Sequence, residues 1–231
     1  MVEVQDRLHA APPALAPRVT RTRVAGRRSV PASWWSAKRA IDVTLGAVGV
    51  VATAPIVALA AAAIVCVSPG SPFFCQDRVG QNGRRFRLYK LRTMVDGAHL
   101  RHDELRPYSE VSGPVFKMRN DPRLHLLGRF LRRTSIDELP NLVNVLRGEM
   151  SLVGPRPPLP SETAFYDDFA RRRLSVKPGI TCLWQISGRS NVSFDEWMRL
   201  DNEYVDKWTP LGDLAIIART LPAVVKGEGA H

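Results

Sequence analysis

The longest apolar stretch of the chain runs from Val43 to Val67 and holds 25 residues without a charged side chain. About 20 apolar residues are enough to cross a bilayer core of about 30 Å, so this stretch predicts a membrane helix. It starts too far along the chain, and is too long, for a cleavable signal peptide. Pro55 stands near its middle, where a proline removes a backbone hydrogen bond and kinks a helix, here into two arms of roughly 18 Å each.

Basic residues flank this stretch on both sides. They are Arg27, Arg28, Lys38 and Arg39 before it, and Arg78, Arg84, Arg85, Arg87, Lys90 and Arg92 after it. Because lysine and arginine favour the cytoplasmic side of a membrane, a single crossing would put one basic flank on the wrong face. We therefore expect a re-entrant helix hairpin over residues 38–67, bent at Pro55, with a single pass as the alternative.

The rest of the pattern predicts a small α/β domain, mostly helical, over residues 68–231. Alternating apolar positions at Phe86 and Leu88 indicate a strand, and apolar residues recur at helical spacing between positions 124 and 146. Further helices are expected at about 161–173, 193–207 and 211–226. Residues 1–37 are rich in proline and arginine and lack hydrophobic periodicity, so we expect a basic mobile tail there.

Composition narrows the class of protein. A chain of 231 residues allows one catalytic unit, and its formal net charge of +11 suits a phosphate-bearing partner or an anionic membrane surface. The three cysteines have no CxxC spacing and the five histidines are scattered, so neither a disulfide framework nor a zinc site is indicated. The sequence also lacks a P-loop and a GxGxxG segment. A reducing, cytoplasmic setting is the simpler interpretation.

Two adjacent acids, Asp137 and Glu138, follow a pair of arginines and have two interpretations. With Ser135 they fit a capping box, in which the acids only stabilise a helix start. Alternatively, an ionised carboxylate is a covalent nucleophile, and a helix N-terminus and arginines would keep its pKa low. The glutamate would then hold Mg²⁺ against a diphosphate. Residues 193–196 repeat the pattern, and there we expect capping alone.

Two basic stretches, residues 84–93 and 154–158, offer further phosphate contacts. Arginine presents a planar fork to phosphate oxygens, and the prolines around Arg156 would stiffen its loop. Phe86 and Tyr89 beside cations leave open a second hypothesis, a membrane-tethered module that binds single-stranded nucleic acid or anionic lipid. Such a module would show salt-sensitive binding and no turnover of nucleotide sugar.

Several segments match a known family in order and almost without gaps. They are Gly80–Gly83, Phe86–Met94, Lys117–Arg123, Gly128–Leu142, Gly148–Pro157, Lys177–Thr181 and Trp184–Arg189. From about Lys38 to its end the chain resembles the monotopic bacterial sugar transferases, which are polyprenyl-phosphate glycosyl-1-phosphate transferases. The resemblance is to the short, exopolysaccharide-priming type. It implies a re-entrant membrane helix and a catalytic domain at the cytoplasmic face of the bacterial inner membrane.

The resemblance also implies a reaction and its residues. Asp137 would attack the β-phosphate of a UDP-sugar and release UMP, and undecaprenyl phosphate would then take the sugar phosphate from the enzyme. Glu138 is implied as the Mg²⁺ ligand and Arg156 as a nucleotide or phosphate contact. Further substrate contacts are expected at Lys90, Arg92, Arg129 and Arg133. Lys38, Arg39 and Asp42 match the start of the membrane element.

Three positions depart from the family pattern. Ala54 stands where a serine usually precedes the hairpin proline, Cys182 replaces a glycine, and Asn191 replaces a frequent aspartate. The region around Trp184 and Gln185 resembles relatives that transfer glucose or galactose. We expect a UDP-hexose, undecaprenyl phosphate and membrane lipid as partners, and no nucleic acid. The sequence leaves the oligomeric state open, a homodimer included, and does not name the glycan that is primed.

Overall fold

The computed structural model describes residues 30–110, 115–116, 118, 120–187 and 193–226. Most of the predicted basic tail, residues 1–29, lies outside this part of the chain. The element α1, Ala32–Val67, is one helix of 36 residues and begins six residues before the predicted start. The reason is aromatic packing, because Trp35 stacks on Trp208 with ring centroids 4.4 Å apart and holds the first turn on the protein body. Residues 32–37 are therefore helix rather than tail.

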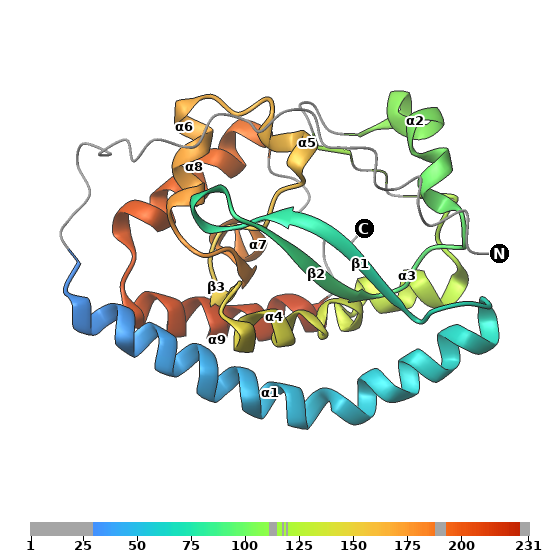
Figure 1. The fold of residues 1–231 in the computed structure, drawn as a ribbon, viewed down its shortest axis with the longest axis horizontal. Coiled ribbons are helices and arrows are strands. Elements are labelled where there is room, and N and C mark those ends of the chain that lie inside the picture. The colour runs from blue at the N-terminus through green and yellow to red at the C-terminus, as the bar shows by residue number, and fades with distance from the viewer. Residues whose placement is uncertain (1–29, 111–114, 117, 119, 188–192, 227–231) are drawn as a thin grey trace.

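Helix α1 is bowed, with its middle farthest from the rest of the protein and both ends curving toward it (Figure 1). Pro55 lies inside the helix rather than in a turn, so the element is one bent helix and the structure does not resolve it into a hairpin of two helices. Thr53 Oγ1 donates a hydrogen bond of 2.7 Å to the carbonyl of Gly49, a contact that bends helices. Thr53 thus supplies a local side-chain bond that Ala54 cannot make.

The surface of α1 is apolar and largely uncovered. Of its 36 residues, only Lys38, Asp42, Gly46 and Ile64 are buried. Val51 and Leu59 expose 76% and 73% of their surface. Soluble proteins rarely leave so long an apolar surface in water, so this helix is suited to a lipid environment.

A β-hairpin follows helix α1. Strands β1, Phe73–Val79, and β2, Arg85–Leu91, pair antiparallel with Phe73 opposite Leu91. The tight turn between them places Asn82 and Gly83 at φ 56° and 78°, a conformation that asparagine and glycine adopt readily. The predicted strand is confirmed, because Phe86 and Leu88 point into the core while Arg87 between them is exposed.

Two short strands form the second sheet. Strands β3, Ser151–Val153, and β4, Gly179–Thr181, pair in parallel. Around them lie α3 (Leu126–Arg133), the 3₁₀ turn η5 (Ile136–Glu138), α4 (Asn141–Arg147), α8 (Phe194–Lys207) and α9 (Pro210–Lys226). The remaining short helices are η2 (Gln81–Gly83), η3 (Ala98–Arg101), α2 (His102–Leu105), η4 (Arg106–Tyr108), α5 (Pro160–Thr163), α6 (Asp168–Arg171), η6 (Arg172–Ser175) and α7 (Leu183–Ile186).

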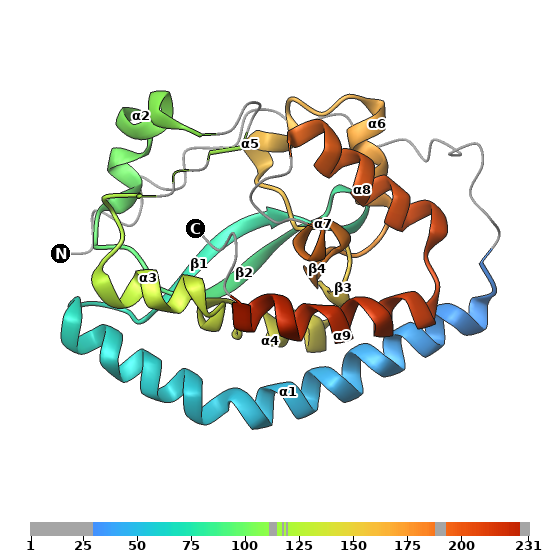
Figure 2. The same ribbon diagram turned by 180° about the vertical axis from the view of Figure 1, so that it is seen from behind.

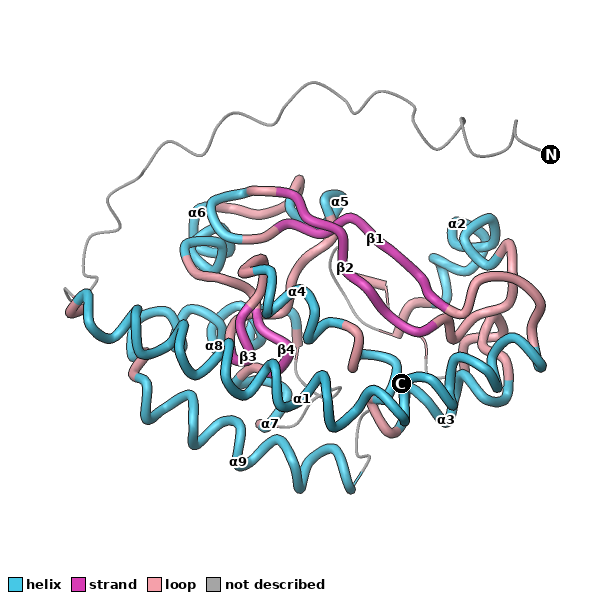
Figure 3. The backbone as a smooth tube through the Cα atoms, turned by 60° about the horizontal axis from the view of Figure 1, so that its bottom comes forward, coloured by secondary structure: helices cyan, strands magenta, loops and turns pink. Residues whose placement is uncertain are grey.

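The helix predicted over 161–173 is wrong as a single element, because Asp167 caps a new helix there and splits the segment. Helices α8 and α9 match the other two predictions. Figure 2 shows α3, α4 and α9 on the side of the body that faces α1, with α2, α5 and α6 on the opposite side. Figure 3 shows both strand pairs between these layers. A mostly helical α/β domain is confirmed.

Candidate active site

The acid pair lies in a tight turn between two helices and not in the first turn of a helix. Ser135 has φ 56° and its side chain caps nothing, and α4 begins only at Asn141 after Pro140. The capping-box interpretation of Ser135 and Glu138 is therefore wrong. Asp137 is buried, with 6% of its surface exposed, while Glu138 is half-buried. The turn presents two carboxylates to one small region.

Glu138 is paired with Lys90 of strand β2. The Nζ of Lys90 lies 2.5 Å from Oε1 of Glu138. Burial raises the pKa of Glu138, but Lys90 and Arg156 outweigh it and hold that pKa at about 2. Burial also lowers the pKa of Lys90, and Glu138 opposes that shift. Glu138 is consequently a carboxylate that stays ionised throughout the physiological range.

Asp137 behaves differently from its neighbour. Burial raises its pKa to about 6, and the charge of Glu138 adds to that rise, while Lys90 lowers it. Arg132 and Arg156 act in the same direction as Lys90. The low pKa expected for Asp137 is wrong, because burial outweighs the cations and the direct ion pair goes to Glu138. No described residue donates a hydrogen bond to the Asp137 carboxylate.

A small pocket adjoins Glu138 and is lined on its polar side by Arg78, Lys90, Arg156 and Gln185. Arg78 is buried, and its guanidinium donates to Pro157 O at 3.0 Å and to Gln76 Oε1 at 2.7 Å. Burial, with Arg156 nearby, lowers the pKa of Arg78 to about 10, so it remains a cation at neutral pH. Arg78 was expected only as part of a basic flank, because nothing in its local sequence shows that it turns inward.

The loop that carries Arg156 is held from three directions. Gly154 N donates to Thr181 O at 3.0 Å, and Gly179 N donates to Pro155 O at 2.9 Å. A Cβ atom on Gly154 or Gly179 would collide with the backbone of the other segment, so both positions require glycine. Arg173, paired with Asp201 at 2.6 Å, donates to the carbonyl of Arg156 at 2.8 Å. The expected stiffness of this loop is thus built by its neighbours as well as by its prolines.

The order of these segments along the chain decides the family. A family model described as bacterial sugar transferase matches residues 33–227, which include α1, the acid pair and the Arg156 loop. The chain belongs to this family.

Relatives among the bacterial sugar transferases cover most of this chain. The galactosyl transferase CpsE of Streptococcus agalactiae is 46% identical over 196 residues, which are 84% of this chain and 43% of CpsE. The exopolysaccharide production protein ExoY of Rhizobium meliloti is 38% identical over 84% of this chain and 88% of its own length. The UDP-glucose:undecaprenyl-phosphate glucose-1-phosphate transferase of Caulobacter vibrioides is 40% identical over 84% of this chain and 72% of that protein. The chain spans less than half of CpsE but most of ExoY.

The remaining predicted substrate contacts of this sugar transferase lie away from the pocket. Arg92 donates to the carbonyls of Ser68 and Pro69, so it fixes the chain just after α1. The side chains of Arg129 and Arg133 are exposed on α3 and make no hydrogen bond or ion pair within the described chain. Arg132, which the sequence did not single out, bonds Thr93 Oγ1 at 3.1 Å and is the arginine near Asp137. Successive residues of a helix cannot face the same side, which separates Arg132 from Arg133.

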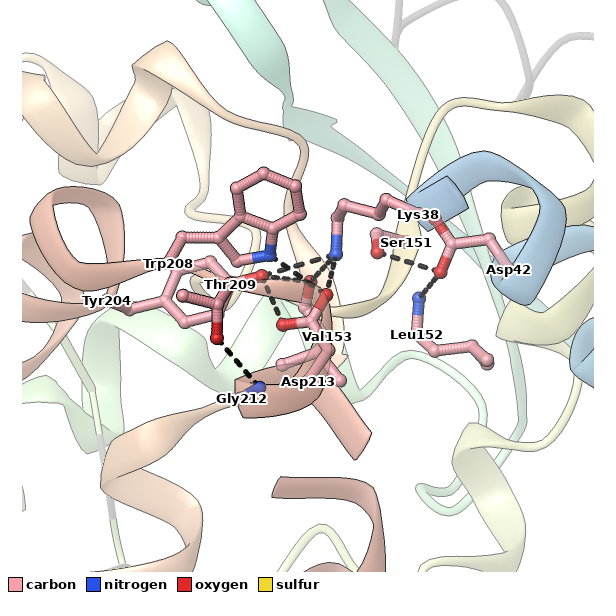
Figure 4. Close-up of polar contacts among 10 residues, drawn as sticks. All are labelled: Lys38, Asp42, Ser151, Leu152, Val153, Tyr204, Trp208, Thr209, Gly212 and Asp213. Atoms are coloured by element: carbon pink, nitrogen blue, oxygen red, sulfur yellow. Dashed lines mark hydrogen bonds and ion pairs between the residues drawn. The ribbon is translucent and has the colours of Figure 1, made fainter. Parts of the chain in front are cut away.

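The residues expected at the start of the membrane element lie against the protein body. Lys38 and Asp42 are buried among β3, α8 and α9 (Figure 4). Arg39 donates to the carbonyls of Val145 and Leu146 at 2.7 and 2.8 Å, at the end of α4. These three side chains dock the helix on the catalytic domain, so they are not free charges for lipid head groups.

Two further predictions are decided by packing. Phe86 is buried in the core, and the ring of Tyr89 is covered by the guanidinium of Arg147 at 5.1 Å. Phe86 is therefore not available as a stacking platform for bases, and Arg147 lies over the ring of Tyr89, which weakens the support for the nucleic-acid hypothesis. Cys182 is buried and its thiol lies 3.3 Å from Oε1 of Gln185, so it orients a residue of the pocket. Asn191 lies outside the described residues.

Proposed function

We propose that the protein transfers a hexose 1-phosphate from UDP-glucose or UDP-galactose to undecaprenyl phosphate and thereby primes exopolysaccharide synthesis. Membership of the sugar transferase family and the activities by which the CpsE and Caulobacter relatives are named support this reaction class. The observation that carries the proposal is the environment of Asp137. Its carboxylate is buried, has no hydrogen-bond donor among the described residues, and lies among Lys90, Arg132 and Arg156.

In the first half-reaction, a carboxylate oxygen of Asp137 forms a bond to the β-phosphorus of the donor. The bond between that phosphorus and the bridging oxygen breaks, and UMP leaves with the electron pair. The product is a sugar phosphate joined to Asp137 as an acyl phosphate, a mixed anhydride. Arg78, Lys90 and Arg156 offset the charge that develops on the phosphoryl oxygens, an effect that is strong in a site partly shielded from water.

In the second half-reaction, a phosphate oxygen of undecaprenyl phosphate attacks the same phosphorus and Asp137 leaves as a carboxylate. The position of Asp137 supports access from the membrane, because the preceding residue, Ile136, packs with Ile64 of α1 in one apolar cluster. The reaction centre therefore lies where the membrane helix meets the catalytic domain.

We further propose that Mg²⁺ is shared between the protein and the donor diphosphate. Among the described residues there is no group of three or more histidines, cysteines or acids that could hold a metal alone. Two adjacent carboxylates with substrate phosphates fit the way Mg²⁺ is usually held, so Glu138 would be its ligand, beside Asp137. When bound, the ion would neutralise the diphosphate. Lys90 would then turn from Glu138 toward the phosphate oxygens.

We propose a re-entrant arrangement of α1 with the catalytic domain at the cytoplasmic face of the inner membrane. The bow of the helix, the internal Pro55 and the exposed apolar surface support it. Lys38 near one end and Arg92 near the other are both fixed to the same body, so both flanks belong to one side of the membrane. A helix that crosses the bilayer would separate these flanks.

The experiment is UMP release by the purified protein in detergent with Mg²⁺ and undecaprenyl phosphate. A panel of UDP-sugars should give turnover with UDP-glucose or UDP-galactose and little with N-acetylated sugars. In the absence of undecaprenyl phosphate, mass spectrometry should find a hexose phosphate on the peptide that contains Asp137. Turnover without that adduct would replace covalent transfer by direct attack of the lipid phosphate. Absence of UMP release from every donor would contradict the proposed function itself.

A further inference from the structure

Strand β3 is held by the membrane helix at each of its three residues. Oδ1 of Asp42 accepts hydrogen bonds of 2.9 Å from Ser151 Oγ and from Leu152 N. One helical turn earlier, Nζ of Lys38 donates to the carbonyl of Val153 at 3.0 Å. Figure 4 shows these two side chains reaching from α1 toward the strand. A single face of the membrane helix thus fixes the strand from its start to its end.

The ammonium of Lys38 is itself fixed by buried partners. It lies 2.5 Å from Oδ2 of Asp213 and 3.2 Å from the hydroxyl of Tyr204. Trp208 Nε1 donates to the same carboxylate at 3.0 Å, and the Tyr204 hydroxyl lies 2.9 Å from both Asp213 Oδ1 and the Val153 carbonyl. The position of the Val153 carbonyl is therefore set jointly by α1, α8 and α9.

Helix docking alone does not account for a buried ion pair at this place. Desolvation of a lysine and an aspartate is costly, and apolar residues of similar size often stabilise a fold as well or better. The first turns of α1 already have apolar anchors in the stacked Trp35 and Trp208, and a polar one in Arg39. What distinguishes the pair formed by Lys38 and Asp213 is the backbone that it holds.

That backbone leads directly into the catalytic pocket. The Val153 carbonyl precedes Gly154 and Pro155, and the next residue is Arg156, which lines the pocket and acts electrostatically on Asp137 and Glu138. The loop has little freedom beyond Val153, because Gly154 N is bonded to Thr181 and Arg173 holds the Arg156 carbonyl. A shift of β3 would accordingly move the guanidinium relative to the acid pair.

We propose that Lys38 and Asp42 are positioning residues of the transferase, which set the Arg156 guanidinium against the donor phosphates through strand β3. Seating of the membrane helix is thereby coupled to the geometry of the phosphate-binding loop. The kinetic part of this proposal rests on the proposed function. Its structural part, that Lys38 orders the Gly154 loop, does not.

The kinetic test is a double-mutant cycle on UMP release. Lys38→Met keeps the length and apolar stem of the side chain, and it should lower kcat/KM for the UDP-sugar about 30-fold, since misplacement of a charged contact by about 1 Å has effects of this order. In an Arg156→Ala background the same change should cost less than about threefold, because Lys38 acts through Arg156. If Lys38→Met lowers kcat/KM as much in the Arg156→Ala background as in the wild type, the proposal is overturned.

The matched control is Arg39→Met, the adjacent residue of the same helix. Arg39 also docks α1 on the body, but through α4 and not through β3. Its effect on kcat/KM should be the same with and without Arg156. If both variants behave alike in the cycle, Lys38 has only a docking role and the proposal fails. Lys38→Arg, which keeps the charge, should restore part of the lost kcat/KM, and the proposal also fails if it restores none.

Hydrogen exchange in the detergent-solubilised full chain tests the structural part without any turnover. The Gly154 amide is bonded to Thr181 and should exchange slowly in the wild type. Lys38→Met, and the milder Ser151→Ala, should accelerate exchange in peptides covering residues 151–156, whereas Arg39→Met should leave them unchanged. An unchanged rate in Lys38→Met would overturn the proposal even if the enzyme is active. Absence of UMP release from the wild type would overturn the proposed function instead.

Discussion

Two stretches of the chain have the same order of residues, a serine, a bulky apolar residue, an aspartate and a glutamate. They are residues 135–138 and residues 193–196. In the second, Ser193 accepts a hydrogen bond from Glu196 N at 3.3 Å and caps the 14-residue helix α8. In the first, Ser135 caps nothing and the acids occupy an isolated turn. The same local signal therefore gives a helix start in one place and the proposed reaction centre in the other.

The difference comes from the residues that come after each stretch. A helix that began at Ser135 would meet Pro140 in its second turn, where a proline lacks the N–H that the helix needs. No proline occurs between Ser193 and Pro210, so α8 can extend. Glu196 then pairs with the exposed Arg199 at 2.6 Å, a contact on the surface of its own helix. The turn at Asp137 instead faces residues from distant strands and loops, among them Lys90 and Arg156.

The most direct test of the difference between the two stretches is to neutralise one aspartate in each of them. Asp137→Asn removes the proposed nucleophile and should lower UMP release by roughly 10⁴-fold or more, as loss of a covalent catalyst does. Asp195→Asn should change it by less than about twofold, because the side chain serves only a surface helix start. Equal activities of the two variants in the UMP-release assay would remove Asp137 from the mechanism. Expression and detergent solubility of both should match the wild type.

The cations around the two glutamates offer a second contrast. Lys90→Met removes a phosphate contact and the partner of Glu138, and it should lower kcat/KM by about 10²- to 10³-fold. Because Lys90 also lowers the pKa of Asp137, the acidic limb of the pH profile should move to higher pH. Arg199→Met breaks an exposed pair and should leave both quantities unchanged. A loss of activity with no shift of the limb would show that Lys90 does not act on Asp137.

The pH dependence of the wild type is set by the raised pKa of Asp137. The proposed nucleophile must be ionised to react, and burial raises its pKa to about 6. Since kcat/KM reports groups of the free enzyme, it should rise about tenfold per pH unit below pH 6 and level off above it. Glu138, with a pKa of about 2, contributes no limb in this range. A profile that is flat from pH 5 to pH 7 would mean that Asp137 has the pKa of an ordinary aspartate.

The sequence predicts elements whose cause is local. Strand β2, the end of α1 at Val67, and helices α8 and α9 are explained by alternation, breakers and helical spacing within a few residues. The resemblance to a family identifies the segments that meet at the pocket. It does not give their positions relative to one another. Ion pairs and pKa shifts that depend on residues far apart in the sequence are missed or misjudged. Lys38 pairs with Asp213, 175 residues later, and burial of Asp137 depends on the fold as a whole.

The choice among neighbouring arginines shows the same limit. Arg129, Arg132 and Arg133 cannot be distinguished in the sequence. Only the orientation of α3 about its own axis places Arg132 beside Thr93. Arg92 lies in the same basic run as Lys90, yet the two point to different places. Lys90 forms an ion pair with Glu138, while Arg92 donates a hydrogen bond to the backbone just after α1. One residue of register reverses the face in a strand and turns a side chain by about 100° in a helix, so a run of basic residues cannot by itself assign contacts.

The smallest expected effect distinguishes the two serines. Ser193→Ala removes a helix cap and should cost about 1 kcal/mol of unfolding free energy. Ser135 has φ 56° and caps nothing, so Ser135→Gly should cost nothing and could stabilise the turn by a few tenths of a kcal/mol, because glycine adopts this conformation without strain. Chemical denaturation of both variants, followed by tryptophan fluorescence under identical detergent conditions, measures the difference. A loss of stability in Ser135→Gly as large as that in Ser193→Ala would mean that Ser135 makes a capping contact after all, and the contrast between the two stretches would then rest on their acids alone.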